Sequence, residues 1–253
     1  MFTKEINQDF FKNWSSNMAY VLGYITADGC IVFRKDRKKN PYILDITSVD
    51  LEHLKKIKNV LNSGYKIGKK SGSYAEKTCY RFQASNPVIT NDLIKIGITP
   101  KKTFRLRPLK IPNKYFSDFI RGFFDGDGSV YIYKVNKTSQ IKASFVASSL
   151  PFIANLNQRL CKNLKIPIKS IQQDKSEFRK GKILYAICFY INDCAKLYKF
   201  MYENKPELYL ERKYQIFKEW ETTERRHYKK QNYPSKIGWR LNKKLCSQIQ
   251  KLI

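Results

Sequence analysis

The stretch YVLGYITADGCIVF, residues 20–33, recurs in altered form as FIRGFFDGDGSVYI at residues 119–132. The second copy follows the first at an offset of 99 residues (119 − 20). In each copy an apolar, helix-like run meets Asp-Gly and passes directly into a strand-like run. A chain that repeats this order once is predicted to contain two similar structural units.

The segments after each copy also run in parallel. A second strand-like stretch leads into a helix-like one in YILDITSVDLEHLKKIKNVL (42–61) and IKASFVASSLPFIANLNQRL (141–160). Aromatic and β-branched stretches follow near residues 77–85 and 182–192. Each half then ends with a helix-like stretch and a basic segment, GITPKKT (97–103) and LYLERKY (208–214). We therefore predict an α+β fold of two αββαββα repeats built on antiparallel sheets.

Domain boundaries follow from this repeat. We predict an N-terminal repeat over residues 1–105 and a C-terminal repeat over 106–220, with the basic, proline-containing stretch RLRPLKIPN (105–113) as the linker. Residues 221–253 fall outside the repeat and form a basic extension with nine Lys and Arg against two Glu. This extension is either a solvated tail or an arm that contacts DNA phosphates.

The charge of the chain limits its partners. Lys and Arg number 49 and Asp and Glu 21, which gives a net charge of +28 and a pI near 9.8. A basic surface of this size can neutralise phosphates and release counterions, so nucleic acid is the leading partner and anionic membrane the weaker alternative. The apolar runs fall short of the roughly 20 residues of a membrane span, and no signal-peptide core is present. We expect a soluble, intracellular protein.

Cysteine and histidine usage argues against two other classes. The six cysteines show no CxxC pairing, and only His53 and His227 are available as histidine ligands. We therefore expect neither a structural zinc site nor a disulfide framework, and thiols that are reduced.

Asp28 and Asp127 are the candidate metal ligands. Small residues four positions apart, Gly23 and Ala27 or Gly122 and Gly126, share a helix face and permit close helix packing. If the two motif helices pack together, both carboxylates meet at helix C-termini, where the dipole and mutual repulsion disfavour them unless a cation compensates. Hard oxygen ligands favour Mg²⁺, with Mn²⁺ or Ca²⁺ as substitutes. A metal ion held between two carboxylates can activate water and stabilise the leaving oxygen in hydrolysis of a phosphodiester.

Gly29 and Gly128 suit the left-handed position that ends a helix. The alternative to a metal site is that each Asp-Gly is only turn chemistry between helix and strand. Two copies in matching context favour the metal site. Backbone carbonyls near Ala27, Gly29 and Gly126 are weaker candidate ligands. Asp125 corresponds to Thr26 in the first copy, so we interpret it as a hydrogen-bonding residue.

VLGYITADG (21–29) and IRGFFDGDG (120–128) resemble the nine-residue motif of the LAGLIDADG homing endonucleases, and the resemblance extends over about residues 15–220. It implies a saddle of antiparallel sheets over DNA, with the motif helices at the domain interface. It also implies double-strand cleavage across the minor groove that leaves short 3′ overhangs. The eighth motif residue is the metal-binding acid of the family, which again selects Asp28 and Asp127.

The resemblance also implies further catalytic residues. A basic residue near the end of each repeat corresponds to Lys102 and Lys213, with Lys101 as a rival to Lys102; each could instead be an ordinary solvated lysine. A polar residue on the strand after the motif, which organises water in relatives, corresponds to Ser48 and Ser148. Some relatives have Gln there, so these serines could instead be strand-end or helix N-cap residues.

Strand alternation predicts the face that contacts DNA. It selects every second residue after each aspartate, and Arg34 is the candidate reader of guanine. Basic residues of later strands are added as contacts to bases or phosphates. The predicted DNA-binding residues are Cys30, Val32, Arg34, Asp36, Lys66, Lys69, Lys70, Arg81, Ser129, Tyr131, Tyr133, Val135, Arg179 and Lys182.

These observations predict a monomeric, site-specific homing endonuclease that cuts double-stranded DNA at a long, loosely palindromic target. The first alternative is an intron-encoded maturase that binds intron RNA with the same fold. The second is a non-catalytic DNA-binding regulator, which has little use for two intact aspartates.

Overall fold

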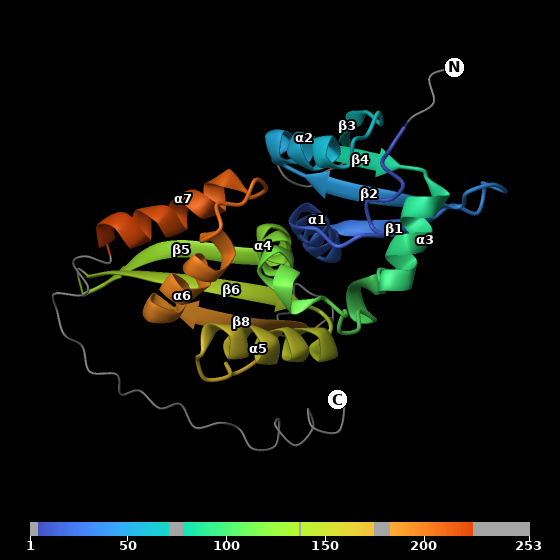
Figure 1. Ribbon diagram of the computed structural model, residues 1–253. Helices are drawn as coiled ribbons and strands as arrows, with labels where there is room; N and C mark the ends of the chain where they lie inside the picture. Colours follow the sequence, from blue (N-terminus) through green and yellow to red (C-terminus); the bar gives the residue numbers. More distant parts are fainter. Residues whose placement is uncertain (1–4, 71–77, 137, 175–182, 225–253) are drawn as a thin grey trace. The chain divides into compact units, whose positions relative to one another are not determined.

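The computed structural model describes residues 5–70, 78–136, 138–174 and 183–224. Two compact units divide the chain (Figure 1). The first unit runs to Asp127 and includes Asn204–Leu210, and the second contains Gly128–Glu203 and the chain from Glu211 onward. Because the motif helix of the second repeat belongs to the first unit, both predicted metal ligands lie in that unit.

A four-stranded antiparallel sheet forms the centre of the first unit, in the order β1-β2-β4-β3. Helices α2 and α3 pack against this sheet (Figure 1). The elements of the unit are α1 (Ser16–Ala27), β1 (Gly29–Phe33), β2 (Tyr42–Ser48), α2 (Leu51–Val60), β3 (Ile67–Lys70), β4 (Cys79–Ala84), α3 (Pro87–Ile96), the 3₁₀ turns η1 (Lys102–Phe104) and η2 (Asn113–Tyr115), and α4 (Phe116–Asp127).

The second unit repeats this plan with the strand order β5-β6-β8-β7, also antiparallel. Helices α5 and α6 pack against its sheet, and α7 contacts β5. Its elements are β5 (Gly128–Val135), β6 (Thr138–Ala147), α5 (Leu150–Leu164), β7 (Gln172–Asp174), β8 (Leu184–Tyr190), α6 (Ile191–Tyr202), α7 (Glu211–Glu219) and a π-helical turn, η4 (Trp220–Glu224). The predicted α+β class and the αββαββα order of both repeats are confirmed.

The two ladders keep the same register. Gly29 pairs with Ile46 in the first sheet and Gly128 with Phe145 in the second, so both partners are shifted by the same 99 residues (145 − 46). In each sheet the residues of one parity are buried beneath the helices, for example Ile46 and Phe145. The opposite parity, called the open face, points away from these helices; it includes the exposed Cys30 and Lys70 and the buried Asp45, and it is the face predicted to contact DNA.

Gly29 has a different role from the one predicted. Among the described residues, Gly97 is the glycine with positive φ, so neither Gly29 nor Gly128 is left-handed. A Cβ on Gly29 would lie 2.7 Å from the Cα of Ile25, which is too close for any side chain. Glycine is required there because strand β1 begins directly against the last turn of α1.

The predicted linker is a packed segment. Leu106, Leu109 and Ile111 are buried, while the intervening Arg107 and Lys110 are exposed. The chain from η1 to η2 is therefore held to the core of the first unit by apolar side chains. The predicted repeat boundary at residues 105 and 106 rests on sequence similarity rather than on compactness, and it stays a prediction. Most of the predicted basic extension, residues 225–253, lies outside the described residues.

Helix length gives one further result. The longest helix in the described part of the chain, α5, has 15 residues. None of the described helices combines the length and apolar character needed to cross a bilayer.

Candidate active site

Helices α1 and α4 pack backbone to backbone. A Cβ on Gly23 would overlap the carbonyl oxygen of Phe119, and a Cβ on Gly122 would overlap that of Tyr20. Any larger residue at either glycine would force the helices apart. The prediction that small residues on one face of each motif helix permit their close approach is confirmed.

The C-terminal ends of these helices meet as well. A Cβ on Gly126 would overlap the Cβ of Ala27 and would lie 3.5 Å from the Cγ of Asp28. The carboxyl group of Asp28 therefore lies alongside the residue that precedes Asp127. Asp28 is exposed and Asp127 is partly exposed, so both acids are accessible at adjoining helix ends.

Asp28 also ends its helix. Its backbone N–H donates to the carbonyl oxygens of Tyr24 and Ile25 in the last turn of α1. No basic residue lies in the last turn of α1 or of α4. Both carboxylates therefore face the negative end of a helix dipole without a basic side chain from their own helix in that turn.

Lys102 lies beside these helix ends. Its side chain is 7% exposed, and its Nζ donates to the carbonyl oxygens of Thr26 at 2.6 Å and Ala27 at 3.3 Å. Burial lowers the pKa of the Lys102 ammonium, while the carboxylates of Asp127 and Asp28 act in the opposite direction. Lys102 is thus within electrostatic reach of both acids. Lys101 is exposed and left-handed, with φ of 57°.

Lys213 repeats this arrangement in the second unit. It lies in α7, is 4% exposed, and donates from Nζ to the carbonyl oxygen of Gly128 at 2.6 Å. Gly128 directly follows Asp127 in the chain. A buried lysine therefore binds a main-chain carbonyl just before Asp28 in one case and just after Asp127 in the other. Because both lysines are buried, neither is an ordinary solvated lysine.

Asp125 is buried and bonded over long sequence distances. Its Oδ2 accepts hydrogen bonds from the hydroxyl of Tyr20 at 2.6 Å and from the backbone N–H of Leu210 at 2.8 Å. The same hydroxyl lies 3.1 Å from Nε2 of His53. Thr26, the counterpart of Asp125 in the first repeat, donates from its hydroxyl to the carbonyl oxygen of Leu22 within its own helix. The interpretation of Asp125 as a hydrogen-bonding residue agrees with this geometry.

The two candidate serines are not equivalent. Ser48 is the last residue of β2, and its Oγ accepts from the hydroxyl of Tyr24 at 3.2 Å and from the N–H of Asp50 at 3.1 Å. The ladder makes Ala147 its counterpart, because Ser48 follows Ile46 by two residues as Ala147 follows Phe145. Ser148 lies one residue beyond β6. The predicted correspondence between Ser48 and Ser148 is therefore wrong by one residue, because these serines are 100 residues apart (148 − 48) and the repeat is 99 residues.

The donor set at the helix ends limits how a metal would bind. Among the described residues, no group of three or more His, Cys, Asp and Glu side chains could hold a metal ion. A site at Asp28 and Asp127 would therefore have two protein carboxylates and take its remaining ligands from backbone carbonyls, water or substrate. Mg²⁺ is commonly held by one or two carboxylates together with substrate phosphates, so this donor set fits it. The carbonyl of Ala27 already accepts from Lys102.

The open face of the first sheet follows the predicted alternation only as far as Val32. Cys30 is exposed and Val32 is partly exposed, whereas the intervening Ile31 is buried. Strand β1 ends at Phe33, so Arg34 and Asp36 lie in the turn beyond it. There Arg34 donates from Nε and Nη2 to the carboxylate of Asp36, at 3.0 and 2.9 Å.

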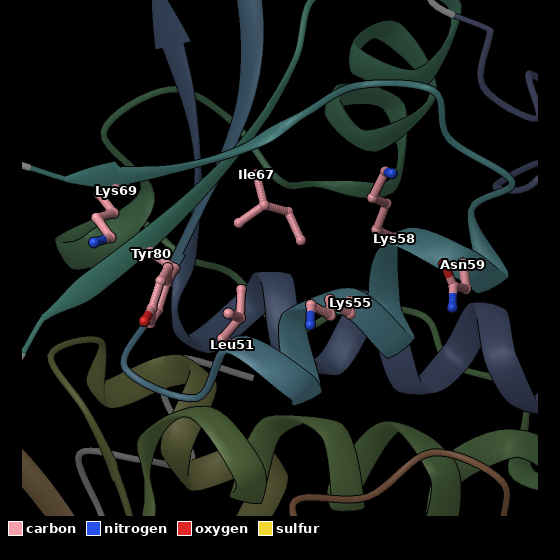
Figure 2. A pocket seen from close by; sticks show the side chains of 7 residues that line it. All are labelled: Leu51, Lys55, Lys58, Asn59, Ile67, Lys69 and Tyr80. Atoms are coloured by element: carbon pink, nitrogen blue, oxygen red, sulfur yellow. The ribbon is translucent and has the colours of Figure 1, made fainter.

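The basic residues of β3 and β4 divide between the two faces. Arg81 lies on the open face and pairs with the carboxylate of Asp45. Lys66 and Lys70 are exposed. Lys69 instead lies toward α2, where it lines a pocket with Leu51, Lys55, Lys58, Asn59, Ile67 and Tyr80 (Figure 2). Lys69 therefore does not share the face of Arg81, because adjacent strand residues point to opposite sides. Arg179 and Lys182 lie outside the described residues.

The open face of the second sheet is rich in hydroxyl groups. Ser129 and Tyr131 are exposed, Ser129 Oγ lies 2.8 Å from Ser144 Oγ, and the Tyr133 hydroxyl donates to Gln140 at 3.0 Å. Val135 ends β5 and is exposed. Lys142 lies over the ring of Tyr190 on the same face, 5.7 Å from its centroid.

Sequence reasoning missed the partners of these residues. Asp45 is the only charged residue in YILDITS (42–48), and it lies at the parity of the open face. That pattern could have marked it. The bond between Asp125 and Leu210 had no comparable signal, because residues 85 positions apart (210 − 125) meet only in the folded chain.

Comparison with known proteins gives structural matches alone. No family model matches the chain, and no curated protein matches it. The LAGLIDADG homing endonuclease I-GzeII, in complex with its DNA target, superposes with a TM-score of 0.57 at 14% identity, over 95% of this chain and 97% of the other. I-SmaMI, bound to uncleaved DNA with calcium ions, gives 0.54 at 13% identity over 95% and 98%. The meganuclease I-AabMI, bound to uncleaved DNA, gives 0.54 at 16% identity over 92% and 96%.

Proposed function

We propose that this chain, which has the fold of the LAGLIDADG homing endonucleases, is a site-specific endonuclease that hydrolyses both strands of a DNA duplex. The observation that carries the proposal is the meeting of α1 and α4 at their C-terminal ends, where the carboxyl group of Asp28 lies alongside Gly126, the residue that precedes Asp127 in the chain. Two accessible carboxylates at adjoining helix termini are electrostatically unfavourable without a cation. A binding protein without catalysis has no use for this arrangement.

Asp28 and Asp127 would hold the divalent ion, which we propose to be Mg²⁺, with Mn²⁺ or Ca²⁺ able to occupy the same site. A divalent ion held there would stabilise the negative charge that develops on the phosphate during hydrolysis. The phosphate oxygens of the bound duplex would complete the coordination, because the described protein residues supply two carboxylates rather than a closed cage. The structure of I-SmaMI with calcium supports a divalent ion in this fold.

Lys102 and Lys213 would act next to these acids. Each is buried and each fixes a main-chain carbonyl within two residues of a motif aspartate. A buried ammonium close to the carboxylates can stabilise charge that develops on the substrate, since water does not screen it fully. We propose Lys102 rather than the exposed Lys101 for this role. Ser48 would position Tyr24 and the start of α2, whereas the Ser148 side chain makes no comparable hydrogen bond within the described part of the chain.

Double-stranded DNA is the proposed substrate. The net charge of +28 supplies the attraction to phosphate, and the three structures named above contain DNA. One chain carries both repeats and both motif aspartates, so a monomer suffices. The open faces of the two sheets differ in chemistry, and the target would therefore be only loosely palindromic, with cuts that leave short 3′ overhangs. The three named structures are complexes with DNA, so they favour a DNA duplex over the intron RNA of the maturase alternative.

The test is selection of a cleaved target from a randomised duplex library with Mg²⁺, followed by the variants Asp28→Asn and Asp127→Asn. Loss of several kcal/mol of transition-state stabilisation predicts at least about a 1,000-fold fall in cleavage rate for each. Binding measured in Ca²⁺ should persist. The control Asp9→Asn removes an exposed carboxylate elsewhere and should cleave normally. Cleavage by either motif variant at the wild-type rate would overturn the proposal.

A further inference from the structure

Asp45 holds the guanidinium of Arg81 by one edge. The two oxygens of Asp45 accept from Nε of Arg81 at 3.0 and 2.8 Å, and Oδ2 also accepts from Nη2. Gln83 donates to Oδ2 from the next position on β4 that shares this face, at 3.2 Å. The carboxylate is only 6% exposed, whereas the Arg81 side chain is 38% exposed. The buried anion thus fixes the orientation of an arginine that remains accessible.

The second edge of this guanidinium is available. Arginine has five N–H donors in a planar fork, and Asp45 engages those on the Nε side. Nη1 makes no hydrogen bond to any residue in the described part of the chain. The Nη1 and Nη2 donors form the pair that matches O6 and N7 of guanine in the major groove. Fixing the fork in advance lowers the entropy lost when the base binds.

The neighbouring strand leaves room for a base. Gly68 of β3 is directly opposite Arg81 in the ladder and lies on the same open face. A Cβ on Gly68 would meet nothing within 4 Å. No side chain from that position can cover the guanidinium, and the next residue of the same parity on β3 is the exposed Lys70.

The ladder also places Arg81 near the candidate active site. Arg81 pairs with Thr47, and Thr47 lies one position beyond Ile46, the partner of Gly29. Arg81 is therefore level with Asp28, two strands away. Two inter-strand spacings amount to about 10 Å, which corresponds to about three base-pair steps of duplex DNA.

The second unit has no such fork at the equivalent place. The 99-residue register makes Ser144 the counterpart of Asp45, and Ala186 opposite Val146 the counterpart of Arg81 opposite Thr47. Cys188 takes the place of Gln83, because it pairs with Ser144 as Gln83 pairs with Asp45. Small neutral side chains cannot make a bidentate contact with guanine.

We propose that Arg81, held by Asp45, is a specificity-determining residue that reads a guanine in the half of the target contacted by the first unit, about three base pairs from a cut. The half contacted by the second unit has no matching requirement. This inference rests on the proposed function, because it needs a duplex on the open face. Arg81 rather than Arg34 is chosen because the carboxylate that holds Arg34 is itself exposed.

The experiment makes two selections from a randomised duplex library: duplexes that are bound in Ca²⁺, and duplexes that are cleaved in Mg²⁺. Both selections are carried out with wild-type protein and with Arg81→Lys, and the base preferences are compared. Lysine keeps the charge but not the fork. We expect a guanine preference of about 10-fold to 100-fold at one position to disappear, with other positions unchanged. The control Arg159→Lys changes an arginine of α5, a helix that packs against the second sheet, and it should keep that preference.

A second measurement needs no variant. Methylation of guanine N7 with dimethyl sulfate, on the selected target, should block binding of the wild-type protein at that guanine. Unchanged preferences in Arg81→Lys, a uniform loss of affinity across sequences as for a phosphate contact, or binding that N7 methylation leaves intact would overturn the inference alone. Failure to select any duplex would overturn the proposed function, and this inference with it.

Discussion

The open faces of the two sheets differ although their ladders coincide. In the first unit, a buried aspartate holds an arginine and a glutamine, whereas the equivalent residues of the second unit are small and neutral. The second face instead carries tyrosines and a lysine, namely Tyr131, Tyr133, Tyr190 and Lys142. In the middle of both sheets the helix-covered parity is apolar, for example at Leu44, Ile46, Ala143 and Phe145. These residues pack beneath the helices and maintain the fold, whereas the opposite parity carries most of the differences between the two sheets.

The motif helices differ in a second way. The side chain of Thr26 in α1 donates to Leu22 of its own helix, while the side chain of Asp125 at the equivalent position of α4 bonds to Tyr20 and to Leu210. The second helix thus carries a buried acid that bonds to α1 and to the segment at Leu210, and the first helix has no acid at this position. The two proposed metal ligands are symmetric in sequence, but the side-chain hydrogen bonds of the two motif helices are not.

The largest expected effect concerns the helix contact itself. Gly122→Val should lower the free energy of unfolding by about 3 kcal/mol or more, because the new side chain would overlap the Tyr20 carbonyl. Gly68→Val, where a Cβ meets open space, should change it by less than about 0.5 kcal/mol. Urea unfolding measures both. Equal losses would mean that close packing of α1 and α4 does not limit stability.

The next effect compares the two buried lysines. Lys102→Met and Lys213→Met should each reduce the cleavage rate about 100-fold, because each removes one positioned cation near the carboxylates. The exposed Lys101→Met is the control and should cleave at the wild-type rate. Single-turnover cleavage of the selected duplex in Mg²⁺ measures all three. A normal rate for either buried-lysine variant would break the functional symmetry of the two repeats.

A smaller effect tests the asymmetry at Asp125. Tyr20→Phe should lower the free energy of unfolding by about 1–2 kcal/mol, since it removes a donor from a buried carboxylate. Thr26→Val removes a hydroxyl that bonds within one helix and should cost less than about 0.5 kcal/mol. Equal costs in urea unfolding would show that the long-range bonds of Asp125 add nothing.

The smallest effect concerns the exposed pair in the β1–β2 turn. Arg34→Ala should leave the midpoint of urea unfolding unchanged, because Arg34 and Asp36 are 46% and 62% exposed and solvent screens their interaction. Urea unfolding again serves as the measurement. A clear fall in the midpoint would mean that this exposed ion pair contributes to the stability of the fold.

Local patterns predicted the element order of both repeats and the candidate site. Strand-like and helix-like stretches gave the αββαββα order, and the repeated motif predicted the close packing of α1 and α4. Each of these signals is contained in a few neighbouring residues. The placement of Asp28 and Asp127 at adjoining helix ends needed no knowledge of distant contacts beyond the match between the two copies.

Register and long-range pairing could not be predicted in the same way. Ser148 lies one residue beyond Ala147, the counterpart of Ser48 in the second ladder. Lys69 lies on the side of β3 that faces α2, because adjacent residues of a strand point to opposite faces of the sheet. The partners of Arg81 and Asp125 lie 36 and 85 residues away (81 − 45 and 210 − 125). Such pairs depend on the folded ladder and on the return of the chain, which local patterns do not contain.

The most direct measurement is a crystal structure of the protein with its selected duplex and Ca²⁺. We predict a calcium ion about 2.3–2.6 Å from a carboxylate oxygen of Asp28 and one at the same distance from Asp127, shared or separate, with phosphate oxygens among the other ligands. Calcium bound to neither aspartate, in a complex with the duplex in place, would contradict the assignment of these residues as the metal site.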